Sequence, residues 1–400
     1  MKTAPAPLAV ARTQGARLIL EDGRELIDGV ASWWTACHGY NHPHIAAAVR
    51  EQLDRMPHVM FGGLAHEPGY RLALRLADLL PGDLDHVFLA ESGSVSVEIA
   101  MKMAVQFHLN RGERGRSKFL AFRGGYHGDT LATMTVCDPE EGMHALFAGV
   151  MPSQVIGDLP IDELSEAALD ALLVERGAQI AAILVEPLVQ GAGGMLMHDA
   201  ETLRRLRRLA DKHGVLLIFD EIFTGFGRTG TMFAMEAAAV IPDIVTLSKA
   251  LTGGTLPLSA AVARSHVFEV FWSDQADAAL MHGPTYMANP LACAAANASL
   301  DLFEAGEWKA DVARIAAGLR EGLEPCRGLP GVTDVRVFGA IGVVEMKEAV
   351  NASALTASFV DQGVWIRPFG KIVYLTPAFV VSDAELATLT AAIRTVLAAI

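Results

Sequence analysis

The sequence predicts an α/β protein with a mainly parallel central sheet covered by helices, and a smaller α+β lobe. Short uninterrupted apolar segments alternate with helix-like segments through most of the chain, which is typical of strands buried on both faces. The chain has 400 residues, of which 52% are hydrophobic and 20% charged. A chain of this length usually exceeds what a single hydrophobic core can serve. We expect an N-terminal segment over 1–44, a large domain over 45–300 and a small domain over 301–400.

The N-terminal segment is expected to contain a β-hairpin. Two apolar stretches, 17–20 and 25–28, flank the turn signal Asp22-Gly23. A helical pattern follows over 45–56, and strands then alternate with helices such as 95–110 and 200–213. The expected strands of the large sheet are 86–90, 118–122, 182–186, 215–220 and 244–248.

The pattern changes after about Asp301, where we expect the small α+β lobe. A helical pattern over 308–324 precedes strand-like segments at 332–338 and 341–345. A further helical stretch leads to the short segments 364–367 and 372–375, and a closing helix begins at Asp383. We expect the N-terminal hairpin to join this lobe.

Composition excludes several classes of protein. The net charge of −14 argues against nucleic-acid binding, and the densest basic segment, 204–208, fits a solvated helix face. Four scattered cysteines without CxxC spacing indicate free thiols in a reducing cytosol. The first residues lack the apolar stretch of a signal peptide, and the uncharged run 278–300 contains two prolines, which suits a buried active-site segment better than a membrane span. We therefore expect a cytoplasmic protein.

Two strand ends carry the residues most informative about chemistry. Lys249 ends one apolar strand and precedes a glycine-rich turn, and Asp220 ends another. Ligands of such folds lie at the carboxyl ends of parallel strands. A lysine that forms a Schiff base and an aspartate that keeps a pyridine nitrogen protonated are the residues that pyridoxal phosphate (PLP) requires. Either residue alone is more often a surface lysine or a turn-capping aspartate; together they favour a PLP site.

Two loops could complete such a site. Gly93 and Ser94 stand between a strand and a helix, where backbone N–H groups and the helix dipole favour a phosphate. An ordinary N-cap serine is the alternative. Tyr126, in the loop Gly-Gly-Tyr-His-Gly, could stack on the cofactor ring or pack within its loop.

Two other motifs fit their apparent chemistry poorly. The segment 225–230, Gly-Phe-Gly-Arg-Thr-Gly, matches the dinucleotide-binding pattern, but its glycines do not form a tight strand-to-helix turn and no helix opens at Gly230. His38 and His42 lack zinc-site spacing and a supporting thiol cluster, so we expect a packed loop and no metal.

The chain resembles the class III aminotransferases of PLP fold type I from about Leu18 to its end. The group-level motifs are LIFDEIFTGFGRTG at 217–230 and LSKALTGG at 247–254. Further blocks resemble the subgroup that transfers an amino group from S-adenosylmethionine to 8-amino-7-oxononanoate in biotin synthesis. They are WW at 33–34, HGYNHP at 38–43, MFGGLAHEP at 60–68, SGSVSVEIAMKM at 92–103, MHGPT at 281–285 and WIRPF at 365–369.

The resemblance implies a role for each matching residue. Lys249 would be the Schiff-base lysine, Asp220 the pyridinium partner, and Gly93 with Ser94 the phosphate cup. Pro284 and Thr285 would reach the phosphate in the neighbouring subunit, so the resemblance implies a homodimer. The substrate pocket would be formed by Trp33, Trp34, Tyr126, Gly283, Arg367 and Tyr374, with Arg367 binding the acceptor's carboxylate through a bidentate contact.

Some alternatives stay open at this point. Members of the family usually carry an upstream segment with a substrate-contacting aromatic residue, and this sequence begins after it. Either the start is misassigned or truncated, or the pocket is closed differently, and we expect substrate affinity and donor selectivity to depend on which holds. The donor could be lysine instead of S-adenosylmethionine. The protein could also be a broad amine or ω-amino-acid transaminase, a PLP-binding protein without turnover, or a nicotinamide dehydrogenase.

Overall fold

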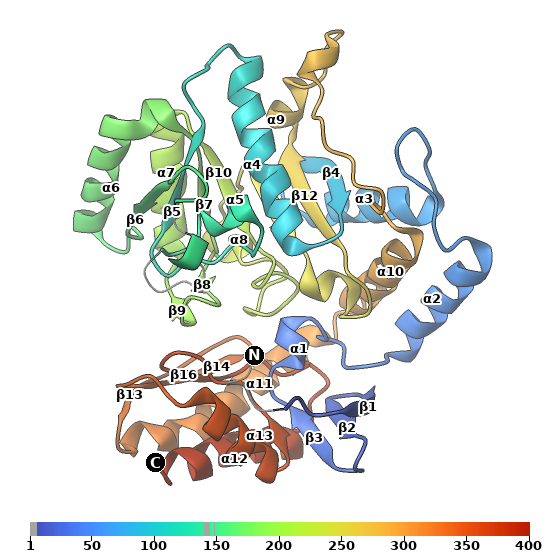
Figure 1. The fold of residues 1–400 in the computed structure, drawn as a ribbon, viewed down its shortest axis with the longest axis vertical. Helices are drawn as coiled ribbons and strands as arrows, with labels where there is room; N and C mark the ends of the chain where they lie inside the picture. Colours follow the sequence, from blue (N-terminus) through green and yellow to red (C-terminus); the bar gives the residue numbers. More distant parts are fainter. Residues whose placement is uncertain (1–5, 140–144, 148) are drawn as a thin grey trace.

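A computed structural model describes residues 6–139, 145–147 and 149–400 and shows two lobes (Figure 1). The larger lobe is built on a seven-stranded sheet, and the smaller combines the C-terminal part with the N-terminal strands. In spatial order the large sheet contains β4 (Leu84–Ala90), β12 (Ser259–Arg264), β11 (Ile244–Leu247), β10 (Leu216–Asp220), β7 (Ile180–Val185), β5 (Lys118–Phe122) and β6 (Val155–Gly157).

The large sheet is mainly parallel, as predicted. Strand β10 pairs in parallel with β11 and β7, and β5 pairs in parallel with β7 and β6. The exception is β12, which is antiparallel to both β11 and β4. Our strand prediction missed β12, because its sequence Ser-Ala-Ala-Val-Ala-Arg has little of the branched and aromatic character of strands.

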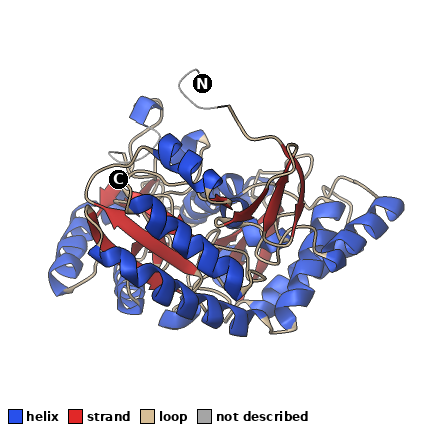
Figure 2. Cartoon of the chain, turned by 90° about the horizontal axis from the view of Figure 1, so that it is seen from below, coloured by secondary structure: helices blue, strands red, loops and turns tan. Residues whose placement is uncertain are grey.

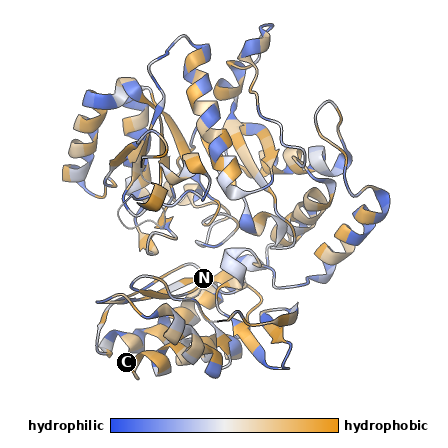
Figure 3. Cartoon of the chain, viewed as in Figure 1, coloured by the Kyte–Doolittle hydropathy of each residue, from blue (hydrophilic) through white to orange (hydrophobic). Residues whose placement is uncertain are grey.

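Both faces of this sheet are covered. Along β10, Leu217 and Phe219 belong to one apolar cluster, whereas Leu216 and Ile218 belong to another. The alternation follows from the two-residue period of a strand. Helix α4 (Gly93–Asn110) contacts β7, β11 and β12, and α7 (Ala200–His213) contacts β7 and β10. Figure 3 shows the central strands as predominantly hydrophobic and the outer helices as two-sided.

The remaining helices of the large lobe are set by local capping signals and by packing. Helix α7 matches its predicted range: Asp199 accepts a hydrogen bond from the N–H of Thr202 at one end, and Gly214 ends it with φ 60°. Helix α10 packs against α2 and α3. The other helices of this lobe are α2 (Pro43–Arg55), α3 (Glu67–Leu79), α5 (Leu131–Met134), α6 (Glu163–Arg176), α8 (Met235–Ala238), α9 (Ser265–Glu269) and α10 (Pro290–Glu304).

The small lobe contains two sheets. One has the antiparallel order β13 (Val332–Phe338), β14 (Ile341–Met346) and β16 (Ile372–Leu375). The other has β1 (Val10–Gln14), β2 (Arg17–Leu20), β3 (Glu25–Asp28) and β15 (Val364–Trp365), so the predicted hairpin does pair with a C-terminal strand. The helices are α11 (Trp308–Leu323), α12 (Ala352–Asp361) and α13 (Asp383–Leu397). Seen from below, strands and helices of this lobe lie side by side (Figure 2).

Predicted boundaries differ from observed ones by a few residues. Helix α4 begins two residues before the expected start, because Ser92 already caps it through the N–H of Val95. Strand β7 ends at Val185, which leaves Glu186 in the following loop. A β8–β9 hairpin (Val189–Gln190 and Leu196–Met197) lies after this loop and was not expected. Within the described ranges, no helix is long and apolar enough to cross a membrane.

Candidate active site

Lys249 and Asp220 lie at the carboxyl ends of adjacent parallel strands. Asp220 is the last residue of β10 and is in register with Thr246 of β11, three residues before Lys249. The backbone of Lys249 has φ 49°, a left-handed conformation that is rare for residues other than glycine. Such strain persists where the surrounding structure enforces it, which is common at functional sites.

The Lys249 amine lies among aromatic rings rather than in solvent. Its Nζ is 4.0 Å from the centre of the Trp34 ring and 5.9 Å from that of Phe223. Desolvation lowers the pKa of Lys249 to about 8, although Asp220, Glu186 and Asp129 oppose this shift by their charge. A lysine with a lowered pKa is neutral, and hence nucleophilic, over a wider pH range.

Asp220 is held by three hydrogen bonds. One oxygen accepts from the N–H of Ile222 at 3.1 Å and from the hydroxyl of Thr246 at 3.3 Å. The other lies 2.8 Å from Nδ1 of His127, and both side chains are buried. These contacts fix the orientation of the carboxylate, which is what a partner of a ring nitrogen requires.

A second buried carboxylate lies behind this pair. Glu186 accepts hydrogen bonds from the N–H of Tyr126 at 3.0 Å and from the N–H of Gly191 at 2.9 Å. Burial raises the pKa of Glu186 to about 7. We had not selected His127 or Glu186 from the sequence; the position of His127 directly after Tyr126, in a loop already singled out, was the available signal for it.

The start of α4 has the shape of an anion site. The first N–H groups of a helix have no partner within it and carry partial positive charge. A Cβ atom on Gly93 would meet Ile222 at 3.0 Å, and one on Gly128 would meet the Ser94 hydroxyl at 2.4 Å. The Ser94 hydroxyl also accepts a hydrogen bond from the N–H of Asp129. The small residues therefore let the two loops approach each other closely at the N-terminus of α4.

Tyr126 borders the space between the two loops and the strand ends. Its ring is half-buried, its N–H is bound by Glu186, and its hydroxyl is hydrogen-bonded to Asp129. Desolvation and this carboxylate raise the pKa of the Tyr126 phenol, so the hydroxyl stays protonated.

Trp33 and Trp34 stand on a turn of unusual conformation. Helix α1 (Ala31–Trp34) has left-handed φ values of 46°, 48°, 54° and 73°, and each such residue costs about 1–2 kcal/mol. The Asp28 carboxylate offsets part of this cost by accepting from the N–H of Val30 at 2.8 Å and the N–H of Ser32 at 3.0 Å.

We predict that Asp28→Asn lowers the free energy of unfolding by about 1–3 kcal/mol. The substitution replaces one of the two accepting oxygens of a buried side chain with an NH₂ group, which leaves a hydrogen-bond donor facing it without an acceptor. A hydroxyl donor, that of Tyr40, also binds Asp28 at 2.6 Å. Asp22→Asn is the matched control, since exposed Asp22 also accepts from a backbone N–H. Urea denaturation measures both; equal losses in the two variants would contradict the role given to Asp28.

The turn brings the two tryptophans to different neighbours. The ring of Trp34 lies 4.2 Å from Phe223 and 6.3 Å from Tyr374, both measured between ring centres. The Arg367 guanidinium lies over the ring of the exposed Trp33, with its central carbon 4.8 Å from the ring centre. Tyr374, on β16, is fully buried. The structure therefore brings Lys249, Trp34 and Tyr374 together, with Trp33 and Arg367 further out.

The segment carrying Gly283, Pro284 and Thr285 lies on the surface. Met281 is 79% and Tyr286 61% exposed, and Gly283 and Thr285 are exposed as well. Our expectation of a buried segment over 278–300 was therefore wrong for its first part, because a lack of charge does not distinguish burial from a surface for association. The second part forms the largely buried α10.

The segment 225–230 is a loop of the large lobe that contacts the small lobe. Nη1 of buried Arg228 donates to the carbonyls of Ala340 at 3.2 Å and Pro377 at 2.8 Å. Desolvation lowers the pKa of Arg228 to about 10. No helix starts at Gly230; the next, α8, begins at Met235 and spans four residues. The segment that matches the dinucleotide-binding pattern therefore serves as a contact between the lobes. The sequence around it, which lacks a strand-to-helix turn, had already argued against a dinucleotide site.

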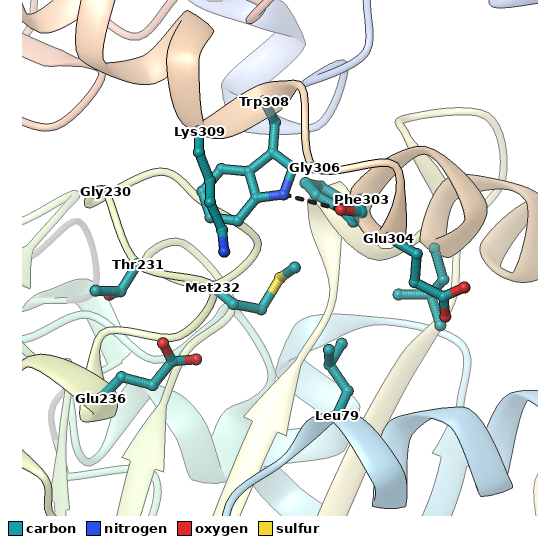
Figure 4. A pocket seen from close by; sticks show the side chains of 11 residues that line it. Leu79, Gly230, Thr231, Met232, Glu236, Phe303, Glu304, Gly306, Trp308 and Lys309 are labelled. Carbon is teal, nitrogen blue, oxygen red and sulfur yellow. Dashed lines mark hydrogen bonds between the residues drawn. The ribbon is translucent and has the colours of Figure 1, made fainter.

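A large cavity of about 530 Å³ lies elsewhere, at the junction between α10 and α11 (Figure 4). Met232, Phe303 and Trp308 line it, together with Glu236 and Lys309. The Trp308 indole closes one side by donating to the Phe303 carbonyl at 3.0 Å. Neither member of the lysine–aspartate pair lines this cavity, so its size does not make it the catalytic site.

A lysine and an aspartate on neighbouring strand ends, beside a helix N-terminus that can hold phosphate, define an aminotransferase of the PLP fold type. The chain belongs to the class-III aminotransferases, because the model of that family matches residues 1–397. A relative from Corynebacterium glutamicum, an adenosylmethionine-8-amino-7-oxononanoate aminotransferase, is 46% identical over 392 residues, covering 96% of this chain and 92% of its own.

Solved structures agree with this assignment. The adenosylmethionine-8-amino-7-oxononanoate aminotransferase of Methanocaldococcus jannaschii has a TM-score of 0.94 and 29% identity, covering 98% of this chain and 93% of its own. An amine transaminase of an uncultivated Pseudomonas species, in a PLP-bound form, has a TM-score of 0.91 and 31% identity. The match covers 98% of this chain and 95% of the Pseudomonas chain. The predicted family, fold class and enzyme class are confirmed, and PLP is the cofactor. The nicotinamide dehydrogenase is excluded.

Proposed function

We propose that this enzyme transfers an amino group from S-adenosylmethionine to 8-amino-7-oxononanoate, giving 7,8-diaminononanoate for biotin synthesis. The near full-length similarity to the Corynebacterium glutamicum enzyme carries the proposal. The placement of Arg367 over Trp33, at the outer side of the lysine site, supports it, because a guanidinium there can bind the carboxylate of an acceptor.

Several residues would hold the cofactor. The N-terminus of α4 with Gly93 and Ser94 would bind its phosphate, Asp220 its ring nitrogen and Lys249 its aldehyde carbon. Tyr126 would contact the ring. When bound, PLP supplies the aldehyde that takes up the amino group and a ring that withdraws electrons from the reacting carbon.

The protein's own groups then bind substrate and move protons. Lys249 Nζ would take the proton from the donor carbon as general base and later give it up as general acid. Asp220 would place its carboxylate beside the ring nitrogen, and His127 Nδ1, 2.8 Å from this carboxylate, fixes its orientation. Trp34, Phe223 and Tyr374 exclude water from the amine.

The lowered pKa of Lys249 predicts the pH dependence of cofactor attachment. Only the neutral amine reacts, so the rate at which cofactor-free protein bonds PLP should rise about tenfold per pH unit and level off near pH 8. An unperturbed lysine would keep rising to beyond pH 10. Stopped-flow absorbance between pH 7 and 10 measures this rate; continued growth without a plateau would contradict the assigned environment.

The active unit of our proposal is a cytoplasmic homodimer. Pro284 and Thr285 would reach the phosphate in the neighbouring subunit. The exposed apolar side chains Met60, Met281 and Tyr286 support an association surface in this region. Gly283 would border the substrate pocket of that neighbour.

A broad amine transaminase is the second candidate. The similarity to the Pseudomonas amine transaminase favours it, since that structure covers the same 98% of this chain as the Methanocaldococcus enzyme, with a TM-score of 0.91 against 0.94. Lysine as donor is a variant of the first proposal. The test is incubation of the PLP-loaded enzyme with 8-amino-7-oxononanoate and each donor in turn, followed by mass spectrometry of 7,8-diaminononanoate. Product with S-adenosylmethionine supports the proposal; rapid turnover of simple amines and no product would favour the alternative.

A further inference from the structure

One side of α4 is hydrogen-bonded to the irregular segment that leads to Thr285. Asn110 donates to the carbonyls of Val270 and Ala278, both at 3.0 Å. One helical turn nearer the N-terminus, Gln106 donates to the carbonyls of Ala278 and Ala279, also at 3.0 Å. Because these carbonyls lie outside any long helix or strand, side chains of α4 provide their partners.

Lys102 extends this row by another turn. Its Nζ donates to the Met281 carbonyl at 2.7 Å and lies 3.2 Å from Nδ1 of His282. Desolvation and the charge of Lys102 lower the pKa of His282, so its imidazole is neutral and can accept this hydrogen bond. Lys102, Gln106 and Asn110 are spaced four residues apart and so share one helix face.

The same helix begins at Gly93 and Ser94. The N-terminus of α4 thus forms the proposed phosphate site, and the side of the same helix is hydrogen-bonded to the segment that leads to Thr285. A helix transmits position well because its backbone is rigidly hydrogen-bonded. The place of Thr285 relative to α4 is therefore fixed by a few side-chain donors rather than by backbone pairing.

We propose that Lys102, Gln106 and Asn110 are positioning residues for the phosphate of the cofactor in the partner subunit. They hold the segment 278–282 so that Thr285 presents its hydroxyl across the dimer interface. This inference rests on the proposed homodimer, in which Thr285 acts in trans. The row on α4 would then set the affinity of the opposite site for PLP without touching the cofactor.

The test uses mixed dimers that each contain a single Lys249. In the first, Lys102→Met and Gln106→Leu lie on the subunit that carries Lys249→Ala; in the second, they lie on the subunit that retains Lys249. The absorbance of lysine-bound cofactor during PLP titration reports only the intact site. We expect about tenfold weaker PLP binding in the first dimer, the effect of losing hydrogen bonds to a charged donor, and no change in the second.

Three controls keep the test specific. Pyridoxal, which lacks the phosphate, should bind all dimers equally. Lys102→Arg with Gln106 intact should restore PLP affinity, because a cationic donor remains. Lys118→Met, which also removes a lysine contact to a backbone carbonyl, that of Ser153, should have no effect.

Equal weakening in both mixed dimers, weakening only in the second, or none in either would overturn the proposal, as would a protein that is monomeric by light scattering. Failure of the proposed substrate assignment gives a different signature. A change of amino donor would alter turnover and leave the PLP affinities of the two mixed dimers as expected.

Discussion

Replacing Lys249 with alanine is expected to abolish transamination. In the proposed mechanism the Lys249 amine both bonds the cofactor aldehyde and moves the proton of the donor carbon. Loss of a general acid–base group alone lowers a rate by about 10²–10⁴-fold, and loss of the covalent attachment adds to this. The purified variant should also lack the absorbance of lysine-bound cofactor.

Lys347→Ala is a suitable control, because Lys347 is exposed in the small lobe beyond β14. It should retain normal turnover and normal absorbance. A small external amine added to Lys249→Ala should restore part of the proton transfer, as it can occupy the space beside Trp34. Transamination by Lys249→Ala at the wild-type rate would show that the site has been assigned to the wrong lysine.

Asp220→Asn is expected to lower the turnover number by about 10²–10³-fold, the range for removing one preorganised electrostatic group from an active site. Asparagine keeps the shape of the side chain and its contact with the N–H of Ile222. It removes the negative charge beside the ring nitrogen, so the loss should appear in turnover more than in folding.

Asp243→Asn provides the matched comparison. Asp243 is also buried, and it accepts from the N–H of Leu217 at 2.7 Å and from Arg207 at 2.9 Å, at the other end of the same strands. This variant should lower stability and leave the turnover of the folded enzyme near normal. Similar kinetic losses in both variants would mean that Asp220 acts through the fold and not through the cofactor.

Much of the site could be predicted from the sequence because parallel strands bring their carboxyl ends together. Lys249 and Asp220 each follow a continuous apolar run, so strand order alone places them at one edge. The N-terminus of α4 was predictable for the same reason, from small residues between a strand and a helix. These predictions depend only on local patterns and on the topology rule for α/β sheets.

Other features depend on long-range contacts. His127 and Glu186 approach Asp220 from two separate loops. His127 could be suspected only from its place beside Tyr126, and Glu186 carries no local signal for a buried polar network. Asp28 helps to hold the left-handed turn at Trp33 through two backbone hydrogen bonds. Non-glycine residues do not favour this conformation, so the local sequence does not predict it. Strand β12 was missed since neighbouring strands, and not its alanine-rich sequence, stabilise it.

The most direct test is the donor half-reaction. PLP-loaded protein is mixed separately with S-adenosylmethionine, lysine and a simple ω-amine, and conversion of the cofactor to pyridoxamine phosphate is followed by absorbance. Our account predicts conversion by S-adenosylmethionine in a single exponential phase, with no conversion in Lys249→Ala. Conversion by the simple amine and none by S-adenosylmethionine or lysine would contradict it and place the chain among the broad amine transaminases.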